Sequence, residues 1–349
     1  MASIIQAIRS QNSPVEIELI GQGQPLVEVA SELGLPLHEI WGSKMRRYFS
    51  LLNVIDFLKL PIVFFQSLYF VWRFMPDVVF AKGGGDSFMP ALVAKILFIK
   101  LYIHETDSIP GLTNRRLGRL ADKIFVSFDE SKQYFDSNKV ELVGNPIRTE
   151  LLNGNKAEAL AFFSFVDTKP IVLITGGSQG AQNVNKIVVE SLIELVTDFQ
   201  VIHLAGAELF QEVDTAVKQV EKEGAETYGK FVEANFRLYP VLNTQEMARA
   251  YAAADVVVSR AGGSIFEIAA LGKPAILIPL PGAATDHQMA NAQALAQYGV
   301  TIINEDNLTE HIFIQEIHDT YNAREALGLR LRAFARPEAA ELIAKALLS

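Results

Sequence analysis

Three glycine-rich turns, each after an apolar run, contain residue types that bind phosphate. They are Gly83-Gly84-Gly85-Asp86-Ser87, Gly176-Gly177-Ser178-Gln179-Gly180-Ala181 and Ala261-Gly262-Gly263-Ser264. Glycine lets backbone N–H groups approach an anion, and a helix behind the turn adds a favourable dipole. Glycine is also common in tight turns for structural reasons, and none of the three is a Walker A or a clean GxGxxG sequence. Three such turns together favour a phosphate-bearing ligand.

Two polar clusters follow later apolar runs. Glu267 lies four residues after Gly263, where a carboxylate is suited either to hold a ribose diol or to stabilise a helix N-terminus. Asp286-His287-Gln288, with Asn291, follows the run 274–280 and offers donors and acceptors for sugar hydroxyls. For this second cluster, an ordinary polar helix start with Asp286 as its cap is the favoured interpretation on residue types alone.

Two further candidates lie in the first half of the chain. His104-Glu105-Thr106-Asp107 ends an apolar run, and a His-Glu pair there is suited to acid–base or positioning chemistry. A lone His or Glu at such a position is more often structural. Arg148 follows Gly144-Asn145-Pro146 and is suited to stack on a planar base, to pair with phosphate or to anchor an interdomain linker.

Eight apolar, β-branched runs are predicted as strands that position these residues. They span residues 15–21, 77–82, 100–105, 123–128, 170–176, 199–206, 255–260 and 274–280. Continuously apolar strands that alternate with helical periodicity indicate parallel sheets covered on both faces. The predicted class is therefore α/β, with two Rossmann-like, doubly wound domains. In such sheets ligands bind beyond the carboxyl ends of the strands, where the glycine turns fall.

The predicted boundaries divide the chain into four segments. Residues 1–147 form an N-terminal domain, 148–168 a linker, 169–335 a C-terminal domain, and 336–349 a helix that packs back toward the N-terminal domain. The run Asp77-Val-Val-Phe-Ala-Lys before a glycine turn is weakly echoed by Asp255-Val-Val-Val-Ser-Arg before another. Two similar halves that face one another would place their strand ends along one cleft.

Length and composition exclude several classes of protein. The chain has 349 residues, of which 50% are hydrophobic, so two globular domains are expected. A formal charge of −9 excludes a general nucleic-acid binder. No cysteine is present, and the six histidines show no HxH or HExxH spacing, so neither a thiolate site nor a zinc site is expected.

The most apolar stretch, residues 48–75, contains Asp56, Lys59 and Pro61 and is too short between them for a membrane-spanning helix of about 20 residues. Its aromatic residues and its flanking Lys44, Arg46, Arg47 and Arg73 suit a helix that lies at a membrane surface. Two core helices broken at Pro61 are an equally supported alternative. No secretory signal is visible at the N-terminus.

Five segments together resemble the MurG family, the N-acetylglucosaminyltransferases of bacterial peptidoglycan synthesis. They are HETDSIPGLTNRRLGRLADKIFVSF (104–128), VGNPIR (143–148), GGSQGAQNVN (176–185), YAAADVVVSRAGGSIFEIAALGKPAILIPLP (251–281) and DHQMANA (286–292). VGNPIR and GGSQGA in series with SRAG and a following Glu are specific, and the matching order covers nearly the whole chain.

The resemblance implies a GT-B fold with two Rossmann-like domains and a cleft between them. It implies transfer of N-acetylglucosamine (GlcNAc) from UDP-GlcNAc to lipid I, with inversion at the sugar carbon, to give lipid II. It also implies no cofactor or metal, because backbone amides and helix N-termini hold the donor phosphates in this architecture. The location implied is peripheral, at the cytoplasmic face of the plasma (inner) membrane, with segment 44–75 as the contact surface. No nucleic-acid partner is expected.

The resemblance also implies roles for residues on the donor side. Ser178, with Gly177 and Gln179, would bind a donor phosphate, and Gly262, Gly263 and Ser264 would face the diphosphate. Arg148 would approach the uracil, whose edge the backbone of 239–244, including Leu242, would read. Glu267 would hold the ribose hydroxyls, and Gln288, with Asp286 and His287, would contact the sugar.

On the acceptor side, the resemblance implies that Gly83, Gly84 and Ser87 form the loop for the acceptor diphosphate. Glu105 would line the acceptor site. Glu105 and His104 are the two local candidates for the base that takes the proton from the acceptor hydroxyl.

The chain departs from the family pattern at several positions. The family starts with a strand and a GGTGGH loop, whereas residues 1–9 here look like the helix that follows them. The family's HEQN motif is replaced here by His104-Glu105-Thr106-Asp107, and its GGYVSGP loop is replaced by GGGDSFMP, which contains an insertion. The turn before Glu267 is one residue shorter than in the family. We therefore hypothesise an N-terminally incomplete version of a normal enzyme. A gap should then lie at the centre of the first sheet, where each buried unpaired backbone group costs about 1–3 kcal/mol.

Two other functions fit parts of the same pattern. The first is a catalytically impaired nucleotide-sugar-binding protein, which would bind UDP-GlcNAc and transfer nothing. The second is a UDP-sugar epimerase, which can share the GT-B architecture and would convert the nucleotide sugar without an acceptor. The sequence favours the glycosyltransferase over both.

Overall fold

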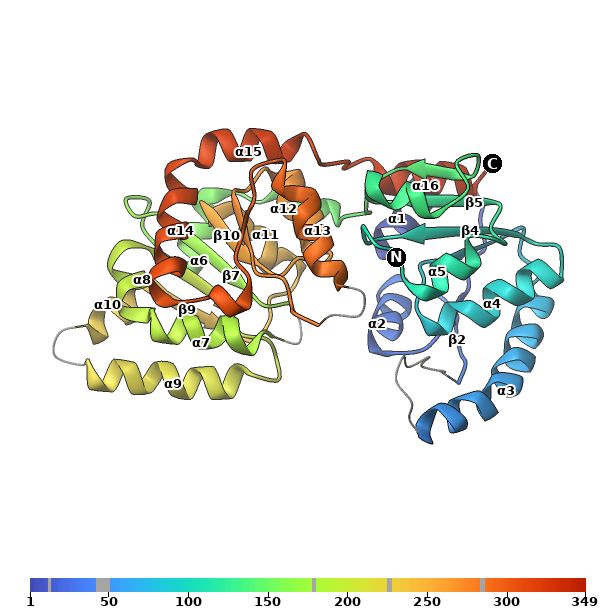
Figure 1. Cartoon of the computed structure of the whole chain (residues 1–349), viewed down its shortest axis with the longest axis horizontal. Helices are drawn as coiled ribbons and strands as arrows, with labels where there is room; N and C mark the ends of the chain where they lie inside the picture. Colours follow the sequence, from blue (N-terminus) through green and yellow to red (C-terminus); the bar gives the residue numbers. More distant parts are fainter. Residues whose placement is uncertain (12–13, 42–50, 178–179, 225–227, 283–285) are drawn as a thin grey trace. The chain divides into compact units, whose positions relative to one another are not determined.

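The computed structural model describes residues 1–11, 14–41, 51–177, 180–224, 228–282 and 286–349, with side chains described outside 51–58. The chain divides into two compact units (Figure 1). The N-terminal unit comprises Met1–Ile147 with Pro337–Ser349, and the C-terminal unit comprises Arg148–Arg336. No described sheet has strands from both units, and each unit has its own buried core.

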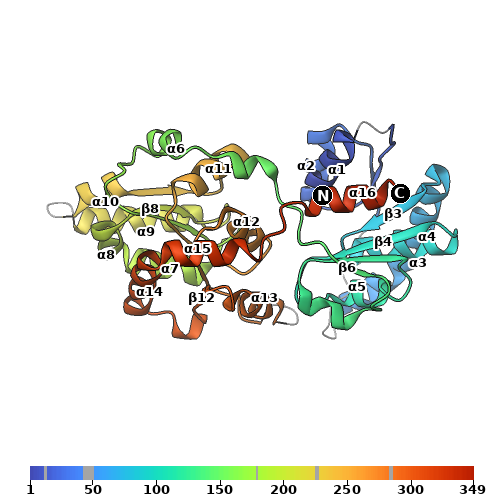
Figure 2. The same ribbon diagram turned by 90° about the horizontal axis from the view of Figure 1, so that it is seen from above.

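The C-terminal unit contains one six-stranded parallel sheet in the order β12-β11-β10-β7-β8-β9 (Figure 2). The strands are β7 (Ile171–Thr175), β8 (Gln200–Leu204), β9 (Phe236–Tyr239), β10 (Val256–Ser259), β11 (Ala275–Leu277) and β12 (Thr301–Ile302). β7, which is the first strand of this unit in chain order, lies between β8 and β10 in the middle of the sheet. Because it is buried on both faces, all five of its residues are buried.

Helices cover both faces of this sheet. Alternate residues of the central strand belong to two different clusters: Val172 and Ile174 pack in one, and Ile171 and Leu173 in the other. The helices are α6 (Lys156–Phe163), α7 (Gln182–Glu190), α8 (Leu192–Asp198), α9 (Phe210–Glu223), α10 (Gly229–Asn235), α11 (Thr244–Ala253), α12 (Ser264–Leu271), α13 (His287–Ala296), α14 (Glu310–Asn322) and α15 (Arg324–Arg332), with 3₁₀ turns η2 (Thr149–Asn153) and η4 (Glu305–Asn307).

The segment 148–168, which the sequence suggests as a linker, is folded into the C-terminal unit. It forms η2 and α6, and both pack on α11. Leu151, Ala159 and Phe163 are buried in the same cluster as Tyr251 of α11. The linker interpretation was wrong because it weighed glycine and alanine content above these spaced apolar side chains, which need a partner to cover them.

The N-terminal unit contains two separate parallel sheets among its described strands. One pairs β1 (Leu19–Gly21) with β2 (Leu37–Glu39), and the other has the order β3-β4-β5-β6. The members of the second sheet are β3 (Val78–Ala81), β4 (Lys100–Glu105), β5 (Lys123–Val126) and β6 (Val140–Leu142). No ladder joins β1 to β3 in this part of the chain, as the gap expected from the sequence requires. The run 15–21 is a strand only over its last three residues.

The helices of the N-terminal unit include one from the far end of the chain. They are α1 (Ala2–Ser10), α2 (Gln24–Leu33), α3 (Leu51–Phe74), α4 (Gly85–Ile96), α5 (Leu112–Leu117), η1 (Asp129–Tyr134) and α16 (Ala339–Leu347). Helix α16 packs against α1 (Figure 2). Ile4 and Ile8 of α1 share a buried cluster with Ile343 of α16 and with Phe125 of β5.

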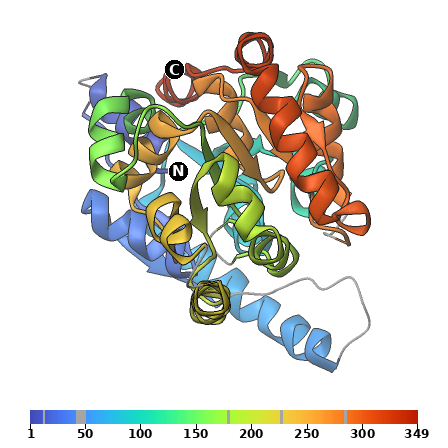
Figure 3. The ribbon, with the colours of Figure 1, turned by 90° about the vertical axis from the view of Figure 1, so that its left-hand side faces the viewer.

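Helix α3 is one continuous helix of 24 residues that contains Pro61, so the expectation of two helices broken at that proline was wrong (Figure 3). Proline removes one backbone hydrogen bond and bends a helix, but flanking turns can continue it. Within the described chain, no helix has the length and apolarity needed to cross a membrane. Residues 44–50 of the proposed membrane-facing segment lie outside the described residues.

Candidate functional site

The carboxylate of Glu267 lies at the centre of a polar cluster in the C-terminal unit. Helix α12 places Glu267 in its first turn, and η2 follows directly after Arg148. Arg148 Nη2 donates to Glu267 Oε1 over 3.2 Å, and Arg148 Nε donates to the same oxygen over 3.3 Å. Tyr251 Oη donates to Glu267 Oε2 over 3.3 Å, and Arg148 Nη1 donates to Thr244 Oγ1 over 3.3 Å. The structure thus brings together Arg148 and Glu267, which are 119 residues apart.

Burial and the neighbouring charge of Arg148 shift the pKa of Glu267 in opposite directions. Burial raises the pKa of its carboxyl group, and the Arg148 guanidinium and the Tyr251 hydroxyl partly oppose that rise. The pKa of Tyr251 is well above its usual value, first because the phenol is buried and second because Glu267 is adjacent. A carboxylate has about four acceptor positions, so the three donors from Arg148 and Tyr251 leave capacity for a ligand hydroxyl. Tyr251, which contacts Glu267, was not indicated as a functional residue by the sequence.

The third glycine turn leads into the helix that carries Glu267. Gly263 is the N-cap of α12, and its backbone is right-handed. Gly262 has no positive φ, and a Cβ built on it would meet no atom within 4 Å. The local fold therefore does not require glycine at 262, and its missing side chain leaves the backbone accessible to a ligand. Ser264 Oγ lies 3.1 Å from Ser259 Oγ at the end of β10.

The second glycine turn joins β7 to α7. Gly177 has a φ of +86°, and its N–H donates to Thr175 Oγ1 over 3.3 Å. Gly180 has a φ of +85°, and a Cβ there would lie 2.3 Å from the carbonyl oxygen of Ala205, so this position tolerates no side chain. Ser178 and Gln179, the residues expected to bind a donor phosphate, lie outside the described residues.

The segment 239–244 connects β9 to α11. Asn243 caps α11 with a reciprocal capping box: its side chain accepts from Glu246 N over 3.0 Å, and its own N–H donates to Glu246 Oε2 over 2.9 Å. Leu242 packs against the buried cluster beneath the sheet. These contacts fix the backbone of the segment beyond the carboxyl end of β9, with Thr244 bonded to Arg148.

The cluster at 286–291 has mixed roles. Gln288 Oε1 accepts from Leu280 N over 3.0 Å, and Asn291 Nδ2 donates to Ala261 O over 3.1 Å, so both residues brace turns after strands. Asp286 occupies the N-cap position of α13, but its side chain makes no cap hydrogen bond. The expectation of an Asp286 cap was wrong because its φ is +49°, whereas a capping side chain needs an extended backbone. His287 starts α13.

Arg260, which follows β10, is a buried cation that the sequence did not single out as a candidate. It is 8% exposed, its Nη1 donates to Ile278 O over 2.9 Å, and its Nη2 forms an ion pair with Glu305. These contacts hold the loop after β10 against the one after β11. Arg260 is therefore committed to structure rather than to a ligand.

In the N-terminal unit, the first glycine turn joins β3 to α4. Gly83 and Gly84 have φ values of +84° and +85°, and Gly84 is the N-cap of α4. Ser87 Oγ donates to Gly84 O over 3.0 Å. A Cβ on Gly84 would meet nothing within 4 Å, whereas one on Gly83 would lie 2.8 Å from Asn114 Nδ2. The turn therefore presents the open N-terminal end of a 12-residue helix beyond β3.

Glu105 organises the loop after β4. Its Oε1 accepts from Asp107 N over 2.9 Å, and its Oε2 accepts from Gly111 N over 3.1 Å and from Asn114 Nδ2 over 3.0 Å. It is 3% exposed, and burial is the largest cause of its raised pKa. All three donors come from the segment 107–114 that follows it and the side chain is buried, so the contacts favour a structural role over that of a catalytic base.

The fully buried His104 and the partly buried Lys82 lie near one another beside this turn. His104 is fully buried, and its Nε2 lies 3.0 Å from Gly144 O and 3.1 Å from Ser127 Oγ. Burial first, and Lys82 second, lower the pKa of His104 well below its usual value, so the imidazole is neutral at pH 7. Burial also lowers the pKa of Lys82 to about 8. Lys82, which the sequence analysis missed, directly precedes Gly83 and could have been found from that adjacency.

No group of three or more His, Asp or Glu side chains able to hold a metal ion occurs among the residues that the structure describes. The polar groups of both units instead cluster around glycine turns beyond the carboxyl ends of β3, β7 and β10. Backbone N–H groups at such turns bind anions directly.

Comparison with known proteins assigns the family. Residues 2–126 match the model of the glycosyltransferase family 28 N-terminal domain, and residues 171–345 match that of the family 28 C-terminal domain. The UDP-N-acetylglucosamine–N-acetylmuramyl-(pentapeptide) pyrophosphoryl-undecaprenol N-acetylglucosamine transferase of Legionella pneumophila (strain Paris) is 36% identical over 310 residues, which cover 88% of this chain and 81% of that protein.

Solved structures share the fold. The crystal structure of MurG from Acinetobacter baumannii has a TM-score of 0.73 at 22% identity and covers 99% of this chain and 94% of its own. UDP-GlcNAc 2-epimerase from Neisseria meningitidis has a TM-score of 0.65 at 17% identity, and the match covers 100% of this chain and 95% of the epimerase chain. At these identities the structures establish the GT-B fold alone. Together with the family models and the Legionella relative, they show that this chain is a family 28 glycosyltransferase that belongs to the MurG family.

Proposed function

We propose that this chain transfers GlcNAc from UDP-GlcNAc to the muramyl-pentapeptide pyrophosphoryl lipid (lipid I) and forms lipid II for peptidoglycan. The observation that carries the proposal is the Arg148–Glu267–Tyr251 cluster beside the glycine turn 262–263. It combines a carboxylate with spare acceptor capacity and an open helix N-terminus. Those are the two features that a ribose and a diphosphate require. The curated relatives carry the name of this activity.

On the donor side, Glu267 holds the ribose hydroxyls, and Arg148 approaches the uracil from the same cluster. The backbone of 239–244, including Leu242, reads the uracil edge, because the capping box at Asn243 fixes that segment. Gly262, Gly263 and Ser264 face the diphosphate, as do Gly177, Ser178 and Gln179. Gln288, with Asp286 and His287, lies against the sugar.

The chemistry proposed is direct inversion. The acceptor hydroxyl attacks the anomeric carbon while the bond to the UDP oxygen breaks, so negative charge develops on the leaving diphosphate. Backbone N–H groups at the starts of α7 and α12 stabilise that charge, and they need no reorganisation because the turns already hold them. The proton of the acceptor hydroxyl leaves to a base. His104 and Glu105 are the candidates named from the sequence, but the burial of both side chains argues against either as the base.

On the acceptor side, Gly83, Gly84 and Ser87 form the loop for the acceptor diphosphate. Lys82 supports this assignment because it adds a partly buried cation directly before the loop. An anion beside Lys82 would compensate the burial of that charge.

We also propose peripheral contact with the cytoplasmic face of the plasma membrane through segment 44–75. Exposed aromatic side chains of α3 support it: Phe65, Tyr69 and Trp72 are 55–65% exposed. Apolar surface of that kind is stabilised in the headgroup region.

A transfer assay tests the activity. The purified full chain is incubated with labelled UDP-GlcNAc, with and without lipid I in detergent, and the products are separated as lipid II, free UDP and epimerised nucleotide sugar. We expect label in lipid II only when lipid I is present. Binding of UDP-GlcNAc without transfer would instead support the impaired binding protein. Conversion of the sugar without acceptor would support the epimerase.

A further inference from the structure

The carboxylate of Glu305 lies between the first turn of α7 and the loop that leads into α12. Glu305 begins the turn η4, which follows β12, and its side chain is only 6% exposed. Its Oε2 accepts a hydrogen bond from Asn183 Nδ2 over 2.6 Å, and its Oε1 forms an ion pair with Arg260 Nη2. One carboxylate therefore joins three segments that follow three different strands of the same sheet.

Each partner of Glu305 lies next to a glycine turn. Asn183 is in the first turn of α7, directly after the turn 176–181 and its neighbour Gln182. Arg260 directly precedes the turn 261–264, which leads into α12. In the proposed donor site, backbone N–H groups of both turns bind one diphosphate. The spacing between the turns must then match the spacing of two phosphate groups, so a residue that fixes this spacing acts on binding without touching the ligand.

Other contacts hold each of the two segments separately. Asn185 Nδ2 donates to Ala205 O over 2.9 Å, which ties α7 to the loop after β8. Arg260 Nη1 donates to Ile278 O over 2.9 Å, which ties the loop before α12 to the loop after β11. The strands β7 and β10 pair with one another, but their ladder ends where the strands end. Beyond that point, Glu305 contacts both segments with one carboxylate.

The charges of this group favour a positioning role over direct binding of a phosphate. Arg260 is buried, and both of its terminal nitrogens have protein partners. A buried cation needs an opposite charge in contact with it, and Glu305 provides that charge. Because the pair is neutral as a whole and Asn183 is uncharged, the carboxylate can hold the two segments with little repulsion toward an anionic ligand.

We propose that Glu305 is a positioning residue for the donor diphosphate, because its two oxygens set the spacing between the N-terminal ends of α7 and α12. The inference rests on the proposed function, since it requires both turns to bind the diphosphate of UDP-GlcNAc. It implies that the Asn183–Glu305 contact affects the binding of UDP, which carries a diphosphate. The binding of uridine, which reaches only the cluster around Glu267, should not depend on it.

The test exchanges the donor and the acceptor of one hydrogen bond in the full chain. Asn183→Asp places a second carboxylate against Glu305 Oε2, so repulsion should separate the two segments. Adding Glu305→Gln to Asn183→Asp restores both a donor and an acceptor, and it restores the net charge. Lys186→Gln is the matched control, because it changes the charge of α7 by the same amount at a side chain that is 70% exposed. The Kd for UDP is measured by calorimetry, and the Kd for uridine by NMR titration.

We expect Asn183→Asp to raise the Kd for UDP by at least about tenfold and to change the Kd for uridine by less than about twofold. The doubly substituted chain should bind UDP more tightly than the Asn183→Asp chain, and Lys186→Gln should bind it as the unaltered chain does. An acidic residue in the first turn of a helix favours the helix, so the Tm should not fall in Asn183→Asp.

Three results would overturn the inference: unchanged binding of UDP in Asn183→Asp, an equal loss in Lys186→Gln or for uridine, and no gain from adding Glu305→Gln. Each of them is a comparison with an unaltered chain that binds UDP. An unaltered chain that does not bind UDP would instead overturn the proposed function, and this inference with it.

Discussion

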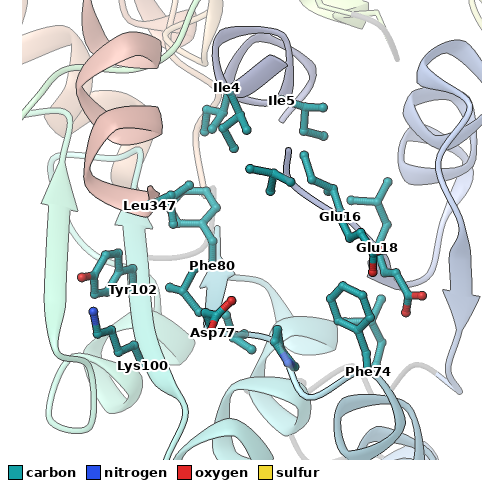
Figure 4. Close-up of a pocket in the computed structure, with 18 of the residues that line it drawn as sticks. Ile4, Ile5, Glu16, Glu18, Phe74, Asp77, Phe80, Lys100, Tyr102 and Leu347 are labelled. Atoms are coloured by element: carbon teal, nitrogen blue, oxygen red, sulfur yellow. The ribbon is translucent and has the colours of Figure 1, made fainter. Parts of the chain in front are cut away.

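The two sheets of this protein differ at their centres. In the C-terminal unit, β7 has a partner on each side, and all of its residues are buried. In the N-terminal unit, β3 lies at an edge of its sheet beside a cavity of about 870 Å³ (Figure 4), with one partner among the described strands and three half-buried residues. The flanking elements are otherwise alike: an apolar strand, a glycine turn and a helix. A strand with a partner on each side therefore supplies much of the burial in a doubly wound sheet. The glycine turn that follows a strand can form even where the strand has one partner.

The largest effect is expected from a substitution in the Arg148–Glu267–Tyr251 cluster of the C-terminal unit. Replacing Glu267 by alanine (Glu267→Ala) removes the carboxylate that accepts from Arg148 and Tyr251. We expect kcat/KM for UDP-GlcNAc to fall about 100-fold, which is about 2.7 kcal/mol of transition-state binding. Tyr251→Phe is the matched control, because it keeps the carboxylate and removes only one donor, and it should fall less than tenfold. Equal kinetics for Glu267→Ala and the unaltered chain would limit Glu267 to stabilising α12.

A matched pair of valines tests the difference in burial. Val257 of β10 is fully buried between two strands, whereas Val79 of β3 is half buried at an open edge. Val257→Ala should cost about 2 kcal/mol in unfolding free energy of the C-terminal unit, and Val79→Ala about 1 kcal/mol or less in the N-terminal unit. Hydrogen exchange of each sheet measures the two values separately. Similar losses at both positions would show that the two sheets are equally packed.

A substitution of Lys82 tests the proposed acceptor site. Lys82→Met keeps the apolar length and removes the charge, so we expect the KM for lipid I to rise about tenfold with little change in the KM for UDP-GlcNAc. Burial lowers the pKa of Lys82 to about 8, so the unaltered chain should lose acceptor affinity as the pH rises through 8. The Lys82→Met variant should lack this pH dependence. A pH profile that is the same in both chains would remove Lys82 from the site.

Folding linkage at Lys82 has the opposite sign. In the unfolded chain a lysine titrates near 10.4, so between pH 8 and that value the unfolded state binds more protons than the folded state. The contribution of this group to stability therefore rises with pH across that window. Unfolding measured at pH 7.5 and 9.5, compared between the unaltered chain and Lys82→Met, checks the sign. Loss of stability specific to the lysine over this range would contradict its burial.

The smallest expected effect concerns the capping box. Asn243→Ala removes the bond to Glu246 N at the start of α11 and should cost about 1 kcal/mol in stability of the C-terminal unit. If the backbone of 239–244 reads the uracil, the KM for UDP-GlcNAc should also rise a few-fold. Asn155→Ala, which removes a cap from α6 elsewhere in the same unit, is the control, because it should lower stability without changing that KM.

The long apolar strands were predictable, and the short ones were not. The runs at 100–105, 170–176 and 255–260 carry enough β-branched residues to be found from sequence, and the structure confirms them as β4, β7 and β10. The strands β2, β6, β9 and β12 have two to four residues each, so tertiary pairing rather than local pattern determines them. The separation of β1 from β3 was expected only from the resemblance, because the local sequence pattern does not show which strands pair.

Some residues of the candidate site were also predictable from the sequence, and others were not. Glycine turns and Glu267 stand out by residue type and by position after a strand. Tyr251 was not found, because a tyrosine on the buried face of a helix looks like core, and only its 3.3 Å contact with Glu267 shows otherwise. The role of Glu105 in bracing its loop also needed coordinates, because its three donors come from residues two to nine positions later in the chain.

The packing of α16 on α1 has a consequence for synthesis. Because Ile343 completes the buried cluster that holds Ile4 and Ile8, the N-terminal unit depends on residues that follow the whole C-terminal unit in the chain. The C-terminal unit is contiguous in sequence and can fold as soon as its own residues emerge. The N-terminal unit must keep this face of α1 uncovered until the C-terminal unit and α16 have been made, and the exposed apolar face is then a place for a chaperone to act.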